Sequence, residues 1–423
     1  MRIKIYVITF YLISLLAAFL TGQKHSNNSI PVVIDAETSS AWVKGAIHVH
    51  SLWSDGNYFP EAVADLYKQL GYNFVAFAEH DTLQSGDKYI KTTEVPKQAI
   101  SANTQKFGAD SITYTEQGEI KLKGMDEYRG LVENNDFILM QGEEISNQKT
   151  IHTLAININK QIPAILEGFD GVNVVKENYR QFNESLDPEV KSMFVVAHPN
   201  SNPLIIPEEI GEIDGGLFME IYNGHPLISN EGGPTKQPLE RMWDVVLFKR
   251  LSRGAENVFG IAADDAHHYY SLTRADAIPG RGYVRVKLNG NKLSTNNVVD
   301  AMIKGDFYSS TGVELFDIKK ENNKLEIKIE QKTPVSNYKT IFIGTKKGVE
   351  FNKIPVYNGN KIVAYKYSDT IGGILKVDTS LNPSYEFTGE EIYVRAKIIA
   401  SDIKNNPKNV NEFEVAWTQA FLP

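Results

Sequence analysis

The chain has 423 residues, with 44 Lys or Arg against 52 Asp or Glu, so its formal net charge is −8. Because it contains no cysteine, disulfide bonds, thiolate nucleophiles and cysteine-based metal sites are excluded. The acidic balance, without any block of basic residues, disfavours a surface that follows a nucleic-acid backbone. Any bound metal ion must therefore be held by His and carboxylate side chains.

The first 22 residues have the order of a secretory signal peptide. Arg2 and Lys4 precede a mostly apolar stretch over residues 5–20, which small residues connect to a polar lead over residues 23–40. The alternative, an uncleaved membrane anchor, needs a longer apolar stretch. We therefore expect an exported protein, periplasmic or extracellular, without a stable membrane span in its mature part; the oligomeric state stays open.

Residues 41–313 alternate apolar strand patterns with amphipathic helix patterns, which predicts βα units around a parallel sheet. In the first unit, a strand over residues 43–50 is followed by a helix that begins at Pro60 and ends before Gly71. Proline at the first turn and glycine after the last are typical of helix ends. Further strands are predicted over residues 73–78, 136–140, 151–158, 193–197, 217–222 and 258–262, and further helices over residues 239–251 and 296–304.

Two segments depart from this alternation. Residues 82–135 form a polar insertion with a predicted helix over 96–106 and a hairpin over 112–122, and its length favours a cap over the functional site. Residues 314–423 show only short alternating strands, which predicts a small β-sandwich. These strands are expected over residues 325–329, 339–343, 361–367, 391–399 and 412–417.

Histidines and carboxylates gather at the ends of the predicted strands. Side chains alternate along a strand, so His48 and His50 point to the same side. His80, His198 and His267 each follow an apolar strand, and the carboxyl ends of such strands meet at one face of an α/β barrel. The same face is expected to receive the carboxylates Asp55, Glu143, Glu144 and Asp265, together with His152 at the start of the next strand.

One such residue by itself would be read as structural, but the set predicts a metal centre. Many imidazoles and carboxylates at one face carry a large desolvation and repulsion cost unless cations lie among them. Imidazole and carboxylate ligands without thiolate suit Zn, Mn or Fe better than Ca or Mg. We therefore expect two or three divalent ions, whose identity the ligand types leave open.

Together these motifs resemble the polymerase and histidinol phosphatase (PHP) superfamily over about residues 42–311. The motifs that carry the resemblance are Ile47-His48-Val49-His50, Ser54-Asp55-Gly56, Glu79-His80-Asp81, Gly142-Glu143-Glu144-Ile145, Ala197-His198-Pro199 and Asp265-Ala266-His267. The exported, histidinol-phosphatase-like branch is the most similar, as judged from Trp53-Ser54-Asp55-Gly56, Tyr222-Asn223-Gly224-His225-Pro226 and Pro279-Gly280-Arg281-Gly282.

The resemblance implies a distorted (β/α)7 TIM-like barrel with a di- or trinuclear centre, here followed by the β-sandwich. The family commonly has Asp where this chain has Glu79, and the pair Glu143-Glu144 leaves the bridging carboxylate ambiguous, with Glu144 favoured by the family's Gly-x-Glu pattern. The implied metal ligands are His48, His50, Asp55, His80, Glu144, His152, His198, Asp265 and His267.

The activity implied is hydrolysis of a phosphomonoester or phosphodiester in a small phosphorylated substrate, by attack of a metal-bridging hydroxide. Groups beyond the ligands must clamp the phosphate and protonate the leaving group, and the candidates Arg281, His225, His268 and Asn223 lie in loops at strand ends. The alternative is structural: Arg281 holds a loop and His268 lies outside the site. The substrate itself is not specified.

Two other functions stay open. The same metal site could hydrolyse carboxylic esters, carbamates or amides, or the protein could bind a surface through its C-terminal β-sandwich. Serine-esterase and thermolysin-like activities are excluded, because the sequence has neither a Gly-x-Ser-x-Gly elbow nor a His-Glu-x-x-His motif.

Overall fold

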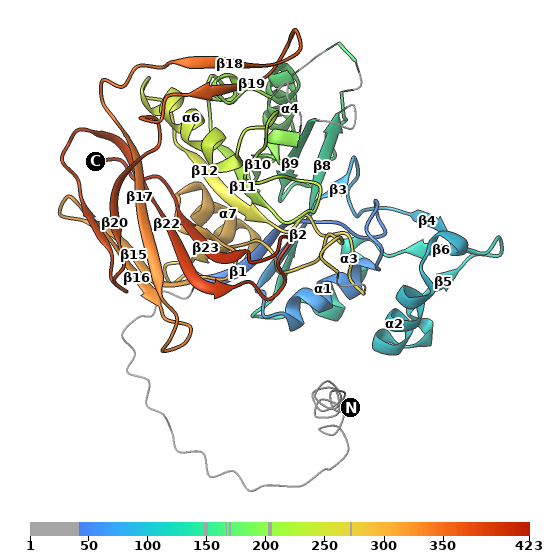
Figure 1. Ribbon diagram of the computed structural model, residues 1–423. Coiled ribbons are helices and arrows are strands. Elements are labelled where there is room, and N and C mark those ends of the chain that lie inside the picture. Colours follow the sequence, from blue (N-terminus) through green and yellow to red (C-terminus); the bar gives the residue numbers. More distant parts are fainter. Residues whose placement is uncertain (1–41, 148–150, 166, 169–170, 202–204, 271–272) are drawn as a thin grey trace, which may run out of the picture. The chain divides into compact units, whose positions relative to one another are not determined.

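The computed structural model describes residues 42–147, 151–165, 167–168, 171–201, 205–270 and 273–423 (Figure 1). The predicted signal peptide and polar lead lie outside these residues. Among the described residues, no helix is both long enough and apolar enough to cross a membrane.

The largest sheet has nine strands in the order β20-β17-β22-β23-β14-β13-β1-β2-β7. Strands β1, β2 and β7 run parallel and confirm three predicted strands, whereas β13 and β14 add antiparallel strands on the other side of β1. The bounds on this half of the sheet are β1 (Trp42–Val49), β2 (Phe74–Phe77), β7 (Ile138–Met140), β13 (Tyr283–Lys287) and β14 (Phe307–Ser310).

The second sheet has six strands in the order β12-β11-β10-β9-β8-β3. Its parallel part, β10-β11-β12, confirms three predicted strands, but β9 runs antiparallel to both of its neighbours. The bounds are β3 (Glu79–His80), β8 (Gly142–Asn147), β9 (Ile151–Ile156), β10 (Met193–Val196), β11 (Leu217–Asn223) and β12 (Val258–Ala263).

The two sheets meet at the carboxyl ends of β1 and β12. Two hydrogen bonds link them there, from Asp265 N to His48 O over 3.0 Å and from His50 N to Ala266 O over 3.1 Å. Hydrogen bonding among the described strands divides them into two sheets, and a closed barrel is not detected from it. The chain also passes from the first sheet to the second between β2 and β3 and between β7 and β8, with one residue between the strands of each pair. The (β/α)7 barrel implied by the resemblance stays a prediction. The β8–β9 hairpin departs from the predicted βα alternation, because the chain reverses direction there without the helical crossover that a parallel pair needs.

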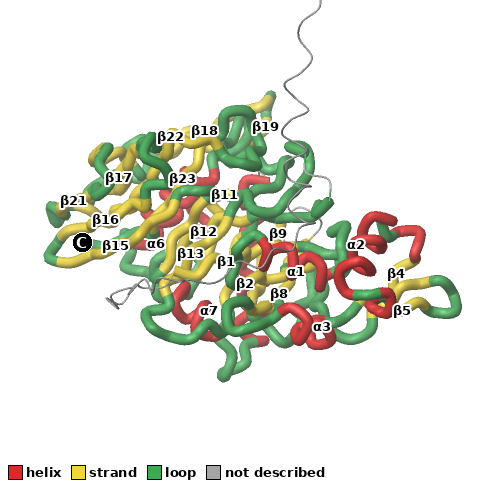
Figure 2. Tube along the Cα trace, turned by 90° about the horizontal axis from the view of Figure 1, so that it is seen from below, coloured by secondary structure: helices red, strands yellow, loops and turns green. Residues whose placement is uncertain are grey.

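Helices cover these sheets (Figure 2). The helix α1 begins at Pro60 as predicted, and Gly71, with φ of +77°, ends the turn after it. The helix α6 is buried around most of its surface, because it packs between the second sheet and the C-terminal strands. The bounds are α1 (Pro60–Gln69), α2 (Lys97–Phe107), α3 (Met125–Val132), α4 (Gly171–Ser185), α5 (Pro207–Ile210), α6 (Leu239–Leu251) and α7 (Thr295–Ile303), with 3-10 turns at Thr92–Glu94, Ala109–Ser111 and Pro199–Ser201.

The insertion contains the predicted helix α2 and hairpin β5–β6 and projects from the edge near α1 (Figure 1). Its small sheet has the order β4-β6-β5, with β4 (Lys88–Lys91), β5 (Thr113–Tyr114) and β6 (Glu119–Leu122). Its apolar side chains pack on Trp53, whose Nε1 donates to Lys123 O over 2.8 Å. The insertion thus supports the loop that carries Asp55, and its role as a cap stays a prediction.

The C-terminal part is β-rich, as predicted. A three-stranded sheet, β15-β16-β21, shares a hydrophobic core with the C-terminal strands of the nine-stranded sheet. That larger sheet contains strands from both sides of residue 313, because β14 pairs with β23. The division into domains at residues 313 and 314 stays a prediction. The bounds are β15 (Glu314–Glu321), β16 (Lys324–Glu330), β17 (Tyr338–Lys346), β18 (Lys353–Asn358), β19 (Lys361–Tyr367), β20 (Gly373–Asp378), β21 (Ser384–Glu386), β22 (Glu391–Ile403) and β23 (Phe413–Thr418).

Candidate metal centre

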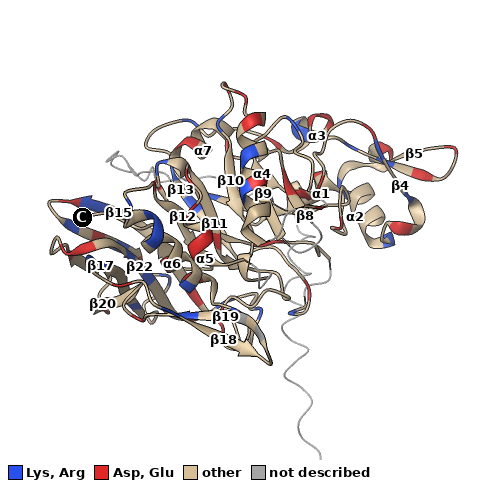
Figure 3. Cartoon of the chain, turned by 90° about the horizontal axis from the view of Figure 1, so that it is seen from above, with Lys and Arg blue, Asp and Glu red and all other residues tan. Residues whose placement is uncertain are grey.

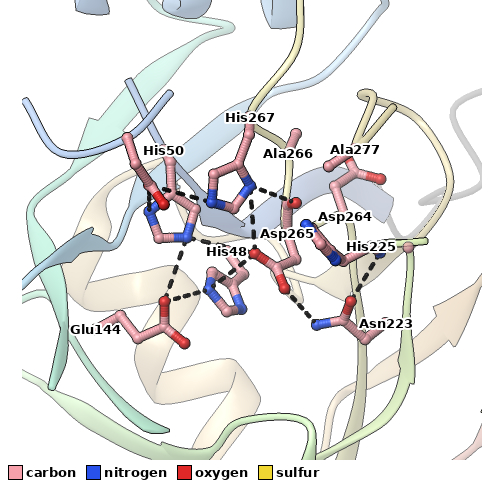
Figure 4. Close-up of polar contacts among 12 residues, drawn as sticks. His48, His50, Glu144, Asn223, His225, Asp264, Asp265, Ala266, His267 and Ala277 are labelled. Carbon is pink, nitrogen blue, oxygen red and sulfur yellow. Dashed lines mark hydrogen bonds and ion pairs between the residues drawn. The ribbon is translucent and has the colours of Figure 1, made fainter. Parts of the chain in front are cut away.

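The structure brings all nine predicted metal ligands into one cluster at the strand ends (Figure 4 draws part of it). Three groups of donors each have their ligand atoms within 4.8 Å of one another, and His198 joins them through its Nε2, 3.2 Å from Glu144 Oε1. The three groups are His50, Asp55, His80 and His267; His48, His50 and Asp265; and His80, Glu144 and His152.

The backbone turns sharply where the strands deliver these side chains. Asp265 has a φ of +51° and His198 a φ of +24°, values that non-glycine residues rarely adopt. Asp265 is held there by its amide, which donates to His48 O, and His198 by its amide, which donates to Glu220 Oε2 over 2.7 Å. Such strained positions are typical of functional sites, where the surrounding structure fixes an unfavourable backbone.

The cluster is divided into a buried floor and a solvent-facing edge. His48 and His50 are fully buried, and the side chain of Glu144 is only 1% exposed. At the edge, the side chain of Asp55 is 56% exposed and that of His80 is 24% exposed. A substrate can therefore reach the cluster from the side of Asp55 and His80.

Opposite charges strongly perturb the titration of the cluster. Burial by itself would lower the pKa of His48, but the carboxylates of Asp265, Glu144 and Glu220 raise it well above its usual value. Burial would raise the pKa of Glu144, but the imidazoles around it hold that pKa well below the usual value. The negative charge of the carboxylates is therefore neutralised either by protons on the neighbouring imidazoles or by bound cations.

Three buried nitrogens test whether metal ions fit. Within the described chain, the Nε2 atoms of His48, His50 and His152 have no hydrogen-bond partner. The first two of these atoms lie 3.2 Å and 3.4 Å from Glu144 Oε2, without the geometry of a hydrogen bond. Unpartnered imidazole nitrogens beside carboxylate oxygens are the donor set that Zn, Mn or Fe accepts, so the residues fit a metal centre.

Glu220 is a supporting residue that the sequence analysis missed. It is fully buried on β11, and its Oε1 lies 2.7 Å from His48 Nδ1. Its Oε2 accepts hydrogen bonds from His198 N over 2.7 Å and from Asn223 Nδ2 over 2.9 Å. A carboxylate on Nδ1 fixes the imidazole with Nε2 facing the cluster. The signal was present in the sequence as a single glutamate within the apolar run Leu217–Tyr222.

Glu79 and Glu143 show how the two departures from the family pattern resolve. Glu79 accepts hydrogen bonds from Ser51 Oγ and Ser54 Oγ, each over 2.5 Å, and so holds the loop that carries Asp55. Glu143 turns away from the cluster, and its Oε1 accepts from Ile162 N over 2.6 Å. Glu144 is therefore the member of the pair that reaches the cluster.

His225 and Asn223 lie beside the cluster. The His225 ring is 5.4 Å from the His267 ring, centroid to centroid, and its Nδ1 accepts a hydrogen bond from Leu227 N over 3.2 Å. Burial lowers the pKa of His225 to about 4, with His267 adding to the shift. Asn223 Nδ2 donates to Asp265 Oδ2 over 3.1 Å. His225 is thus a neutral ring whose Nε2 carries the proton.

Arg281 and His268 make contacts that fit their structural alternatives. The fully buried Arg281 guanidinium donates to backbone carbonyls, including Gly224 O over 3.0 Å and Asp276 O over 2.6 Å. His268 Nδ1 accepts from Ala277 N over 3.2 Å. Arg281 therefore holds the loop beside the cluster, and a direct catalytic role for either residue stays a prediction.

No family model matches the sequence, and no curated protein matches it. Eight chains of solved structures are distantly similar to this one, and they include the following two. One, from Bacteroides vulgatus, is described as a two-domain protein containing a predicted PHP-like metal-dependent phosphoesterase; identity is 12%, the TM-score is 0.40, and the match covers 95% of this chain and 100% of that one. The other, a candidate metal-dependent phosphoesterase from Bifidobacterium adolescentis, has 13% identity, a TM-score of 0.30, and coverage of 61% of this chain and 95% of that one.

Proposed function

We propose that the protein is a metal-dependent phosphoesterase of the PHP type. The observation that carries the proposal is the set of buried imidazole nitrogens without hydrogen-bond partners among the described residues, of which the Nε2 atoms of His48 and His50 lie beside Glu144 and Asp265. When bound, divalent ions would supply Lewis acidity and lower the pKa of a water molecule held in the centre. The chain would hold these ions through the nine clustered side chains.

The remaining work falls to side chains around the ligands. Glu220 and Asn223 orient His48 and Asp265, and Glu79 holds the loop of Asp55. His225, neutral and carrying its proton on Nε2, is placed to donate a hydrogen bond to a substrate oxygen near His267. These roles need no nucleophile from the protein.

A phosphoester is favoured over an acyl ester by charge. Two or three divalent ions exceed the charge of the carboxylates at the centre, so the site attracts a dianionic phosphate more than a neutral carbonyl. Lysine, arginine and acidic residues are interspersed along the chain (Figure 3), which supports a small phosphorylated substrate rather than a nucleic-acid backbone. Hydrolysis of carboxylic esters, carbamates or amides is the second candidate.

The proposal is tested by metal content and a substrate panel. The chain from Gln23 onward should purify with two or three Zn, Mn or Fe ions and hydrolyse p-nitrophenyl phosphate or bis-p-nitrophenyl phosphate. A chelator should abolish this activity, and added metal should restore it. Turnover of acyl esters alone would replace the phosphoester assignment, and a chain that stays inactive with every metal and substrate class would refute the enzyme assignment.

Export is a separate proposal that rests on residues 1–22. Expression of the full chain in a bacterial host with two membranes should place the protein in the periplasm, with an N-terminus near Gln23. Full-length protein recovered from the cytoplasm would contradict it.

A further inference from the structure

A cavity of about 690 Å³ lies between β1, the start of β13 and the C-terminal β-rich part. We call it the Lys44 cavity; its walls come from Lys44, the end of α1, Tyr269, residues 273–274 and 278–281, and the loop at residues 405–407. None of the nine clustered side chains lines it. Its volume is that of sites that bind small organic molecules.

Lys44 presents a charge without a carboxylate partner. Its Nζ lies 4.0 Å from the centroid of the Tyr72 ring and 4.3 Å from that of Tyr283. Within the described chain, no carboxylate oxygen is within ion-pair distance of this amine. Burial lowers the pKa of Lys44 to about 8, so the amine is mostly protonated at neutral pH. A cation held between two rings in a partly buried position is stabilised by any anion that enters the cavity.

The rest of the lining favours a ligand that is both apolar and anionic. Leu66 and Leu70 give the cavity an apolar wall, and Arg274 adds a second cation without a carboxylate partner among the described residues. Two further cations line the cavity. Arg281 is engaged by backbone carbonyls, including Gly224 O and Asp276 O. Lys332 is neutralised by Glu414, whose Oε1 lies 2.5 Å from its Nζ. The charge that remains unpaired in the cavity is therefore positive.

We propose that the Lys44 cavity binds a small organic anion, whose carboxylate or phosphate group pairs with the Lys44 amine and whose body packs against Leu66 and Leu70. One residue, Tyr269, connects the cavity to the backbone of the metal cluster. Tyr269 lines it, and the Tyr269 hydroxyl donates to His50 O over 2.5 Å and to Ala266 O over 2.7 Å. The ligand would therefore lie against the wall that positions the backbone of the cluster.

Competitive labelling of lysines tests this site with simple anions as probes. The metal-loaded chain is treated with trace acetic anhydride at pH 8, with and without benzoate, inorganic phosphate or benzamide, and acetylation is read by peptide mass spectrometry. A bound anion at about ten times its Kd should slow acetylation of Lys44 about tenfold, since the free fraction falls accordingly. Lys320, exposed over the ring of Phe387 and outside the cavity, is the internal control.

Each added compound tests a different chemical class of ligand. Protection by benzoate assigns a carboxylate ligand, protection by phosphate assigns a phosphate ligand, and benzamide, the neutral analogue of benzoate, should not protect. The variant Arg274→Gln should weaken protection. Equal labelling of Lys44 in all conditions, or equal protection by benzamide, would overturn the proposal.

A second measurement separates this cavity from the metal cluster, which also attracts anions. Benzoate or phosphate should raise the Tm of the unmodified chain more than that of Lys44→Met, whose side chain keeps an apolar stem between the two tyrosine rings. Both proteins should bind the same amount of metal. An identical rise in Tm in the two proteins would mean that the anions bind only elsewhere, and would refute the proposal.

Discussion

His48 Nδ1 lies 2.7 Å from Glu220 Oε1, and both side chains are fully buried. This contact fixes the imidazole, so that the unpartnered Nε2 faces Glu144 and Asp265. It also joins β1 to β11, two strands that belong to different sheets. The orientation of the cluster therefore depends on a carboxylate that is not among the predicted ligands.

The substitution Glu220→Ala is expected to weaken metal binding by roughly 10- to 100-fold, because His48 loses its orienting partner. Glu220→Gln should retain part of the affinity, since its amide oxygen can still accept from Nδ1. Affinity is measured by competition with a chromogenic chelator. Glu212→Gln, at an exposed glutamate near Lys176, is the matched control and should bind metal normally. Unchanged affinity in Glu220→Ala would exclude an orienting role.

The substitution Asp265→Ala should remove bound metal and phosphoesterase activity together. Asp265 Oδ1 lies 3.5 Å from His48 Nε2 and 3.4 Å from His50 Nε2, so its loss takes a carboxylate from the centre of the buried group. Asp265→Asn is the better variant for folding, because asparagine tolerates the φ of +51°. Metal per chain is measured by mass spectrometry, and a full complement in both variants would show that Asp265 is not a ligand.

Regular periodicity made much of the fold predictable. The buried strands β1, β2, β10, β11 and β12 are apolar runs that end in turns, and α6 has the predicted bounds because a proline precedes it and its helical pattern is long. The rule that strand ends gather polar groups then located the clustered histidines, Asp55, Asp265 and the pair Glu143-Glu144, of which the family resemblance favoured Glu144. Strand β13 was not predicted, since a short alternating run such as Tyr283–Lys287 does not show which strand it pairs with.

The polar residues of the cluster made two features around it difficult to predict from the sequence. Strand β8 was not predicted, because Glu143 and Glu144 interrupt its apolar pattern, and without it the β8–β9 hairpin and its reversal of direction could not be foreseen. Glu220 was overlooked for the same kind of reason, as a charged residue inside an apolar strand. Functional side chains break the local rules from which strands are predicted, so these failures concentrate around the cluster.

Metal-free protein should lose stability as the pH rises from 6.5 to 8. Burial would lower the pKa of His80, but Glu144 and Asp55 raise it to about 9 from its usual 6.5. In this window the folded chain keeps a proton that the unfolded chain releases, which costs up to about 1.4 kcal/mol of unfolding free energy per pH unit for each such proton. Below pH 6.5 both states are protonated and the contribution is complete.

Urea unfolding at pH 6.5, 7.25 and 8.0 measures this effect. The decline should be smaller in the metal-loaded chain, where cations replace the protons, and smaller in metal-free His80→Asn. The series ends at pH 8 because burial lowers the pKa of Lys404 to about 8, and above it that lysine adds a slope of opposite sign. If the stability of the metal-free chain rose over this range, the folded chain could not be holding more protons than the unfolded chain, and the prediction would be wrong.

The pair Arg395–Asp244 should be the stabilising contact between α6 and β22 that is most sensitive to loss of one partner. Arg395 Nε and Nη2 lie 2.8 Å and 2.7 Å from the two Asp244 oxygens, and neither side chain is more than slightly exposed. Asp244→Ala leaves the guanidinium buried without this partner, which should cost about 3–5 kcal/mol in urea unfolding. Arg180→Met, which breaks exposed pairs with Glu177 and Glu184, should cost less than about 1 kcal/mol. If the two variants lost similar stability, the Arg395–Asp244 contact would have to be solvated, and the C-terminal β-rich part would have to be held to α6 mainly by apolar packing.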